Sequence, residues 1–264
     1  MTLDLDELTE GWSCPSGELR ARLITGRDGC EFVQIRLDLG VMQLAPTGRP
    51  DGAEFRGFRT ACECVDQAAR ERQRVDREAW QELERELQQF NYRRVAYGHL
   101  AEDALRASDD AATRRYIAAA LDDVTACERR VRLQREVLGE TPETSTLSAT
   151  LAFDRGRLQT QLHLVDGQFE RAVEQAEASA AELERLLAEL GHDPDAIADD
   201  PGVAYLRELS VKLRREYGIT QTLREQLAEA IEREDFESAA QLRDALRRRS
   251  GTPERPTDWD WPDM

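Results

Sequence analysis

The sequence predicts a mainly α-helical protein, in which helices pair as antiparallel hairpins and a small β-hairpin lies near the N-terminus. Apolar residues recur three and four positions apart through most of the chain beyond Thr60, as one buried face of a helix requires. Charged residues make up 34% of the 264 residues, a share that suits helices with large exposed faces. Residues 18–44 instead alternate between apolar and polar positions over short runs, which favours strands.

The N-terminal part is expected to hold these strands. Residues 1–12 are acidic and predicted to be flexible, and residues 13–59 form the predicted β-hairpin region. There the run LRARLIT is followed by the turn signal GRDG and by the β-prone run CEFVQIRLDLGVMQL. Gly40 interrupts the second run, so a third short strand at 41–44 is an open alternative. A two-stranded hairpin is marginal in water, so we expect it to pack on a helix or to pair with another chain.

Residues 60–190 are predicted to form a helical hairpin region. The apolar spacing indicates one helix over 60–107, a second that ends near Leu138, a third over 147–164 and a fourth over 169–190. The segments SDDAA, GETPETST and VDGQ separate these helices, and their small, acidic and turn-forming residues can end one helix and cap the next.

The remainder divides into three parts. Residues 191–202 form an acidic linker, and residues 203–250 a second helical segment that starts with a short helix over 205–217. Residues 251–264 carry three prolines and no helical period, so they are predicted to form a disordered acidic tail.

Three junctions between helices resemble one another. They are SDDAATRRYIAAAL, VDGQFERAVEQAEAS and REDFESAAQLRDAL, each with a small or acidic turn before a helix that carries alanines. The distances between them are unequal, so they do not form a fixed-period repeat. We interpret them as the corners of helical hairpins, in which small residues allow two helices to approach closely.

Charge and composition argue against several classes of function. The formal net charge is −17, and the acidic excess is spread along the chain, so no segment offers a basic face for direct binding of nucleic acid. Lys212 is the one lysine, which excludes the Lys-Ser/Thr of a nucleotide-binding P-loop. An arginine-rich, lysine-poor chain is typical of a GC-rich, bacterial genome. The first residues lack a signal peptide, and no apolar run approaches a membrane span, so the expected compartment is the cytoplasm.

No constellation of catalytic or metal-binding residues stands out. The three histidines are dispersed, and Cys62 and Cys64 are one residue apart without a second pair, which does not fit a structural zinc site. Pairs of neighbouring aspartates fit helix caps and solvated faces better than general acid–base pairs. We therefore expect no enzymatic activity, no cofactor and no metal.

The segment ITQTLREQLAEAIEREDFESAAQLRDALRRR, residues 219–249, is the most informative part of the sequence. Leu223, Leu227 and Ala230 share one face of a first helix, and Asp235 can cap a second helix. On that helix Phe236 and the residues that follow at helical spacing form a matching apolar stripe. A hairpin of about thirty residues has too little core to be stable alone, so its apolar face must be covered by the chain, by a second copy or by a partner.

This segment closely resembles the UvrB/UvrC motif, also called the UVR domain, over roughly residues 215–250. The residues that carry the resemblance are Leu223, Leu227, Ala230, Ile231, Glu234–Glu237, Ala239, Ala240, Leu242–Asp244 and Leu246. In that family the motif is a protein–protein contact, which joins the helicase and nuclease subunits of bacterial nucleotide excision repair and also occurs in Clp-type ATPases and their adaptors. The N-terminal VQIRLDLGVMQL and GRPDG resemble uncharacterised bacterial proteins that end in the same motif.

The resemblance implies a non-catalytic adaptor protein, linked to excision repair or to Clp-type proteostasis. Its partner would be another protein, such as one with a UVR-like motif, or the chain itself through coiled-coil-like helix pairing. The alternative is a self-associating structural protein, in which the hairpin only completes its own core or a dimer. The expected contact residues are Leu223, Leu227, Ile231, Phe236, Glu237, Ala239, Leu242, Arg243, Asp244 and Leu246.

Overall fold

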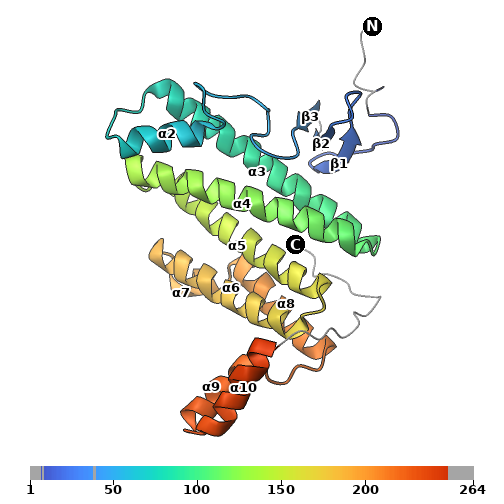
Figure 1. Ribbon diagram of the computed structural model, residues 1–264, viewed down its shortest axis with the longest axis vertical. Helices are drawn as coiled ribbons and strands as arrows, with labels where there is room; N and C mark the ends of the chain where they lie inside the picture. Colours follow the sequence, from blue (N-terminus) through green and yellow to red (C-terminus); the bar gives the residue numbers. More distant parts are fainter. Residues whose placement is uncertain (1–6, 8, 38–39, 249–264) are drawn as a thin grey trace. The chain divides into compact units, whose positions relative to one another are not determined.

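The computed structural model describes residues 7, 9–37 and 40–248, and it is mainly α-helical, as predicted. Nine helices and one three-stranded sheet lie within these residues (Figure 1). The chain divides into two compact units, Met1–Ser148 and Ala149–Met264. The predicted tail at 251–264 lies outside the described residues, as does most of the segment predicted to be flexible at the N-terminus.

The small sheet of the first unit is antiparallel, with strand order β1-β2-β3. Its strands are β1 (Arg20–Thr25), β2 (Glu31–Leu37) and β3 (Gly40–Leu44), so the third strand, an open alternative in the sequence, is present. Val33 of β2 pairs with Leu23 on one side and with Leu44 on the other. Val33 and Ile35 are fully buried, as expected for alternate residues on the inner face of a half-buried sheet.

The helices of the first unit are α2 (Ala61–Arg70), α3 (Arg77–Arg106) and α4 (Asp110–Leu138). The sequence predicts one helix over 60–107, whereas the structure divides this stretch into α2 and α3. Arg72 adopts a left-handed conformation with φ 55°, which ends α2. Asp76 then caps α3, because its carboxylate accepts from the Ala79 amide at 2.9 Å. Apolar spacing continues across the break and gave no sign of it.

The second unit starts within α5 (Pro142–Val165), which begins earlier than the predicted residue 147 because proline suits the first turn of a helix. The other helices are α6 (Phe169–Glu189), α7 (Pro194–Ala198), α8 (Pro201–Glu216), α9 (Leu223–Glu232) and α10 (Phe236–Arg248). The short α7 lies inside the predicted linker. The core of the unit includes the buried side chains Leu164, Phe169, Val173, Leu183, Leu206, Leu209 and Leu213.

Three hairpin corners share one backbone geometry, as their sequences suggested. Ser108, Gly167 and Glu234 each adopt a left-handed φ, of 57°, 67° and 58°. Each donates its amide to the carbonyl three residues earlier, and the next residue donates to the carbonyl five residues earlier. This pair of bonds satisfies the last carbonyls of the first helix. The second helix can therefore start within two residues.

Candidate functional site

The C-terminal hairpin of α9 and α10 begins with a complete capping box. The Glu225 amide donates to Thr222 Oγ1 at 3.2 Å, and the Thr222 amide donates to Glu225 Oε2 at 2.7 Å. Both interactions satisfy amides that a helix N-terminus leaves free. Thr222 is buried, so the start of α9 is packed into the second unit.

The corner between the two helices is tight. Glu234 donates to the Ile231 carbonyl at 3.0 Å, and Asp235 donates to the Ala230 carbonyl at 2.9 Å. Asp235 Oδ1 then accepts from the Ser238 amide at 3.0 Å and caps α10, as predicted from the sequence. Hydrogen bonds from the Ser238 hydroxyl and amide lower the pKa of Asp235, so the cap carries a negative charge at neutral pH.

The base of the hairpin is held by ion pairs. Arg214 of α8 binds Glu177 of α6 through Nε at 2.9 Å and Glu225 of α9 through Nη2 at 2.5 Å. Arg224 pairs with Glu174, 3.2 Å away. Burial alone would raise the pKa of Glu225, but the Arg214 guanidinium and the Thr222 amide outweigh it and lower the pKa. These contacts fix the direction in which α9 leaves α8.

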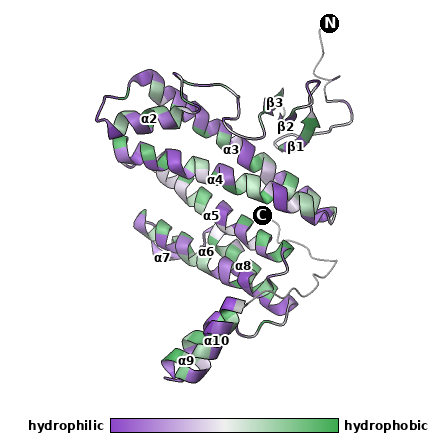
Figure 2. Ribbon diagram, viewed as in Figure 1, coloured by the Kyte–Doolittle hydropathy of each residue, from purple (hydrophilic) through white to green (hydrophobic). Residues whose placement is uncertain are grey.

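The ten residues expected to bind a partner fall into two sets. Half-buried residues, Leu223, Leu227, Ala239, Leu242 and Leu246, lie along the two paired helices. The exposed residues are Ile231, Phe236, Glu237, Arg243 and Asp244. Ile231 and Phe236 have exposed fractions of 55% and 72% and flank the corner. Figure 2 shows hydrophobic and hydrophilic residues alternating along both helices.

No sequence pattern predicts the ion pairs at the base. Thr222 and Glu225 form the T-x-x-E pattern of a capping box, which the sequence displays and which could have located the start of α9. Arg214 and Glu177 are 37 residues apart, and no local pattern connects them.

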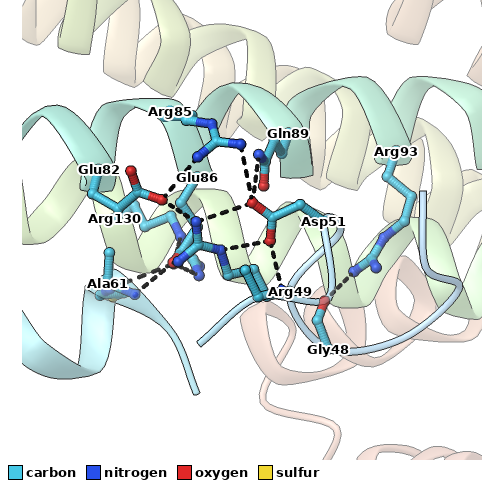
Figure 3. A network of polar contacts seen from close by, with 12 residues as sticks. Gly48, Arg49, Asp51, Ala61, Glu82, Arg85, Glu86, Gln89, Arg93 and Arg130 are labelled. Atoms are coloured by element: carbon cyan, nitrogen blue, oxygen red, sulfur yellow. Dashed lines mark hydrogen bonds and ion pairs between the residues drawn. The ribbon is translucent and has the colours of Figure 1, made fainter. Parts of the chain in front are cut away.

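A second polar cluster lies in the first unit, around the fully buried Glu86 (Figure 3). Its carboxylate accepts from Arg130 Nε at 2.8 Å and from the Ala61 amide at 2.5 Å. Glu86 therefore satisfies the N-terminus of α2 from another helix. Arg49 joins the cluster through Glu82 and Asp51.

Next to this cluster, Arg93 forms two hydrogen bonds with Asp123, of 2.9 Å and 2.7 Å, and binds the carbonyl oxygens of Ala45 and Gly48. Burial raises the pKa of Asp123, and the Arg93 guanidinium opposes this shift. The charged groups around Glu86 and Asp123 are thus engaged with one another and hold the 45–52 loop on α3. Their arrangement supports a structural role.

The described part of the chain contains no group of three or more His, Cys, Asp or Glu residues that could hold a metal ion. Among its helices, none combines the length and apolar character that a membrane span requires.

In a comparison with protein families, residues 219–248 match the UvrB/uvrC motif (UVR). The match coincides with α9, the corner and α10. UVR motifs mediate protein–protein interaction in UvrB and UvrC. No curated protein and no solved structure matches the chain.

Proposed function

We propose that this protein is a non-catalytic adaptor, which uses the hairpin of α9 and α10 to bind another protein. The observation that carries the proposal is the exposure of Phe236, at 72%, inside the segment that matches an interaction motif. A large aromatic side chain that is exposed to water contributes little to the stability of the fold. The same side chain contributes strongly to binding when a partner buries it in an interface. Ile231 extends the apolar surface across the corner.

The charged residues beside this apolar surface support the proposal. Glu237, Arg243 and Asp244 are exposed and carry both signs of charge. Interfaces commonly place such residues at a polar rim, where they set register and orientation. The ion pairs of Arg214 at the base also suit a recognition element, because contacts that restrain the hairpin before binding reduce the conformational freedom that it loses on binding.

The partner we propose is a cytoplasmic protein that carries a UVR-like motif or its binding surface, such as a component of nucleotide excision repair or a Clp-type ATPase. The alternative is association with a second copy of this chain, in which the hairpin has a structural role. Both forms of association would use the segment that matches the motif.

Affinity purification of the tagged full chain from its native cells, with identification by mass spectrometry, tests the proposal. Wild type should capture a protein with a UVR motif or a UVR-binding surface, and Phe236→Asp should lose it. The melting temperature should stay unchanged, because an exposed side chain contributes little to the folded state. Tyr92→Asp is a matched control, since Tyr92 is an exposed aromatic residue on α3 with an exposed fraction of 40%.

The outcomes separate the two functions. Loss of capture with Phe236→Asp but not with Tyr92→Asp would support the adaptor. Recovery of the chain alone would favour self-association, and light scattering should then show that Phe236→Asp reduces the mass of the oligomer. Equal capture by wild type and Phe236→Asp would refute a role of this surface.

A further inference from the structure

A cleft of about 960 Å³ opens in the first unit, between the segment that joins α2 to α3 and the last turns of α4. Two stretches of chain line it, residues 66–80 and residues 129–137. Its volume lies within the range of small-molecule sites in proteins. The cleft is far in sequence from the C-terminal hairpin and plays no part in the proposed adaptor function.

The cleft is positively charged, although the protein is strongly acidic. Its lining contains two acidic residues, Asp66 and Glu136, and five arginines, Arg70, Arg72, Arg74, Arg129 and Arg132. The two acids leave an excess of positive charge, whereas the whole chain carries −17. A positively charged cleft in an otherwise negatively charged protein concentrates anions.

The arginines of the cleft differ in their partners. Asp66 accepts from both Arg70 and Arg129, each at 2.9 Å. Arg72, Arg74 and Arg132 line the same cleft and form no ion pair or side-chain hydrogen bond with any residue that the structure describes. Three guanidinium groups therefore keep their donors available. A guanidinium binds phosphate or carboxylate oxygens with two parallel hydrogen bonds.

The backbone at Arg72 gives a second, independent observation. Its φ is 55°, and its amide donates to the Ala69 carbonyl at 3.1 Å while the Gln73 amide donates to the Ala68 carbonyl at 2.8 Å. This is a helix end that glycine normally occupies, because a side chain in the left-handed region costs free energy. An arginine at such a position lowers stability, which is understandable if its side chain has a function.

One wall of the cleft is apolar. Trp80 and Leu133 line it; Leu133 belongs to the buried hydrophobic cluster around Leu83, and the half-buried Trp80 packs against that cluster. Val75 adds to the same wall. A packed indole beside several guanidinium groups suits a ligand that combines a planar ring with a multiply charged group.

We propose that this cleft binds a small phosphate ester with a planar ring, that is, a ligand of the nucleotide class. Arg72, Arg74 and Arg132 would bind the phosphate oxygens, and the ring would lie against Trp80. A long polyanion such as nucleic acid is disfavoured, because the net charge of −17 on the chain would repel it. A small anion meets only the positive lining.

Isothermal titration calorimetry on the full chain tests this proposal with the four common ribonucleoside mono- and triphosphates, tripolyphosphate and adenosine. At least one nucleotide should bind with a dissociation constant below ~1 mM. Tripolyphosphate, which lacks the ring, should bind more weakly than that nucleotide, and adenosine should show no binding. The proposal would be overturned if none of the nucleotides bound with a dissociation constant below ~1 mM.

Variants identify the site. Arg72→Gly should weaken binding of the nucleotide about tenfold, as expected for loss of a charged contact, and at the same time raise the melting temperature. Because this change relieves backbone strain, weaker binding cannot be ascribed to misfolding. Arg132→Gln should also weaken binding, whereas Arg59→Gln, at an exposed arginine outside the cleft, should not. Nucleotide affinity unchanged in both cleft variants would refute the site.

Trp80→Leu tests the ring. This variant should lose the preference for the nucleotide over tripolyphosphate while tripolyphosphate affinity stays the same. A preference retained in Trp80→Leu, or equal affinity of the wild type for both ligands, would refute the nucleotide class, since the ring would then contribute nothing at Trp80.

Discussion

Arg214 and Glu225 connect α8 to α9 through a hydrogen bond of 2.5 Å between Nη2 and Oε1. The same guanidinium binds Glu177 of α6, and Glu225 also closes the capping box with Thr222. One arginine thus couples the helix that carries the corner to the core helices of the second unit. The orientation of the hairpin depends on side chains outside the matched motif.

Arg214→Ala should loosen the base of the hairpin without unfolding the unit. Both partners are partly exposed, so the loss in global stability should be about 1 kcal/mol or less. Hydrogen exchange of the amides at 219–226 should accelerate, while the core of α8 stays protected. Arg215→Ala is the matched control, because Arg215 is exposed on the next position of α8. Equal exchange in both variants would contradict an anchoring role of Arg214.

Glu234→Gly should stabilise the hairpin. Glu234 has φ 58°, a conformation that costs a non-glycine residue about 1 kcal/mol and glycine almost nothing. Urea unfolding should show a gain of about that size. Glu232→Gly, in the last turn of α9, should instead lose ~0.5–1 kcal/mol, because glycine is unfavourable within a helix. A loss in both variants would mean that the corner is not strained.

Acid should weaken the cap of α10. The pKa of Asp235 in the folded protein is lowered from 3.8 by its hydrogen bonds to Ser238. A lowered folded pKa gives stability that is present above 3.8 and is lost as the pH falls through the folded value. The exchange protection of Ser238 should therefore be constant between about pH 5 and 7 and decrease below about pH 4. Asp235→Asn keeps an acceptor that does not titrate, so it should remove this pH dependence.

Glu86→Gln should destabilise the first unit by about 3 kcal/mol or more, because Arg130 would remain buried without its counter-charge. The midpoint of urea unfolding measures the loss. Glu84→Gln is the control on the same helix, since Glu84 is exposed and should change stability by less than about 0.5 kcal/mol. A similar midpoint for both variants would mean that the buried charge contributes nothing.

Gly156→Ala should separate α5 from α6. A β-carbon at this position would lie 2.4 Å from Ser179 Cβ and 2.5 Å from its Oγ, so the helices would have to move. Overpacking of this kind costs about 1–3 kcal/mol. Ser179→Gly in the same chain removes both close atoms and should recover part of the loss. Melting curves of the two single variants and the double variant give the coupling free energy between the two positions. If the changes in stability were additive, the close contact between Gly156 and Ser179 would be contradicted.

The secondary structure was predictable where local chemistry decides it. Asp235 could be assigned as a helix cap because its carboxylate accepts from an amide only three residues later. The three corners could be grouped because the hydrogen bonds that end each helix join residues at most five apart. The break at Arg72 was not predictable, because an arginine occupies a position where glycine is the usual signal.

The site shows the same division. Phe236 lies on a helix whose apolar spacing the sequence displays, so it could be named as a candidate contact residue, and the structure places it in an exposed position. The ion pairs of Arg214 and the cleft beside Trp80 bring together residues far apart in the chain. Their partners depend on tertiary packing, which no spacing rule in a single sequence encodes.

Some contacts in this chain join residues far apart in the sequence and others join close neighbours, and this difference implies an order of folding. Arg93 binds the Ala45 carbonyl across 48 residues, and Arg130 binds Glu86 across 44, so these contacts require closure of long loops. The corner at Glu234 joins residues at most five apart. Short-range contacts form fastest, so we expect the C-terminal hairpin to assemble soon after its residues become available. The first unit should fold more slowly, because its buried ion pairs join residues that are far apart in the sequence.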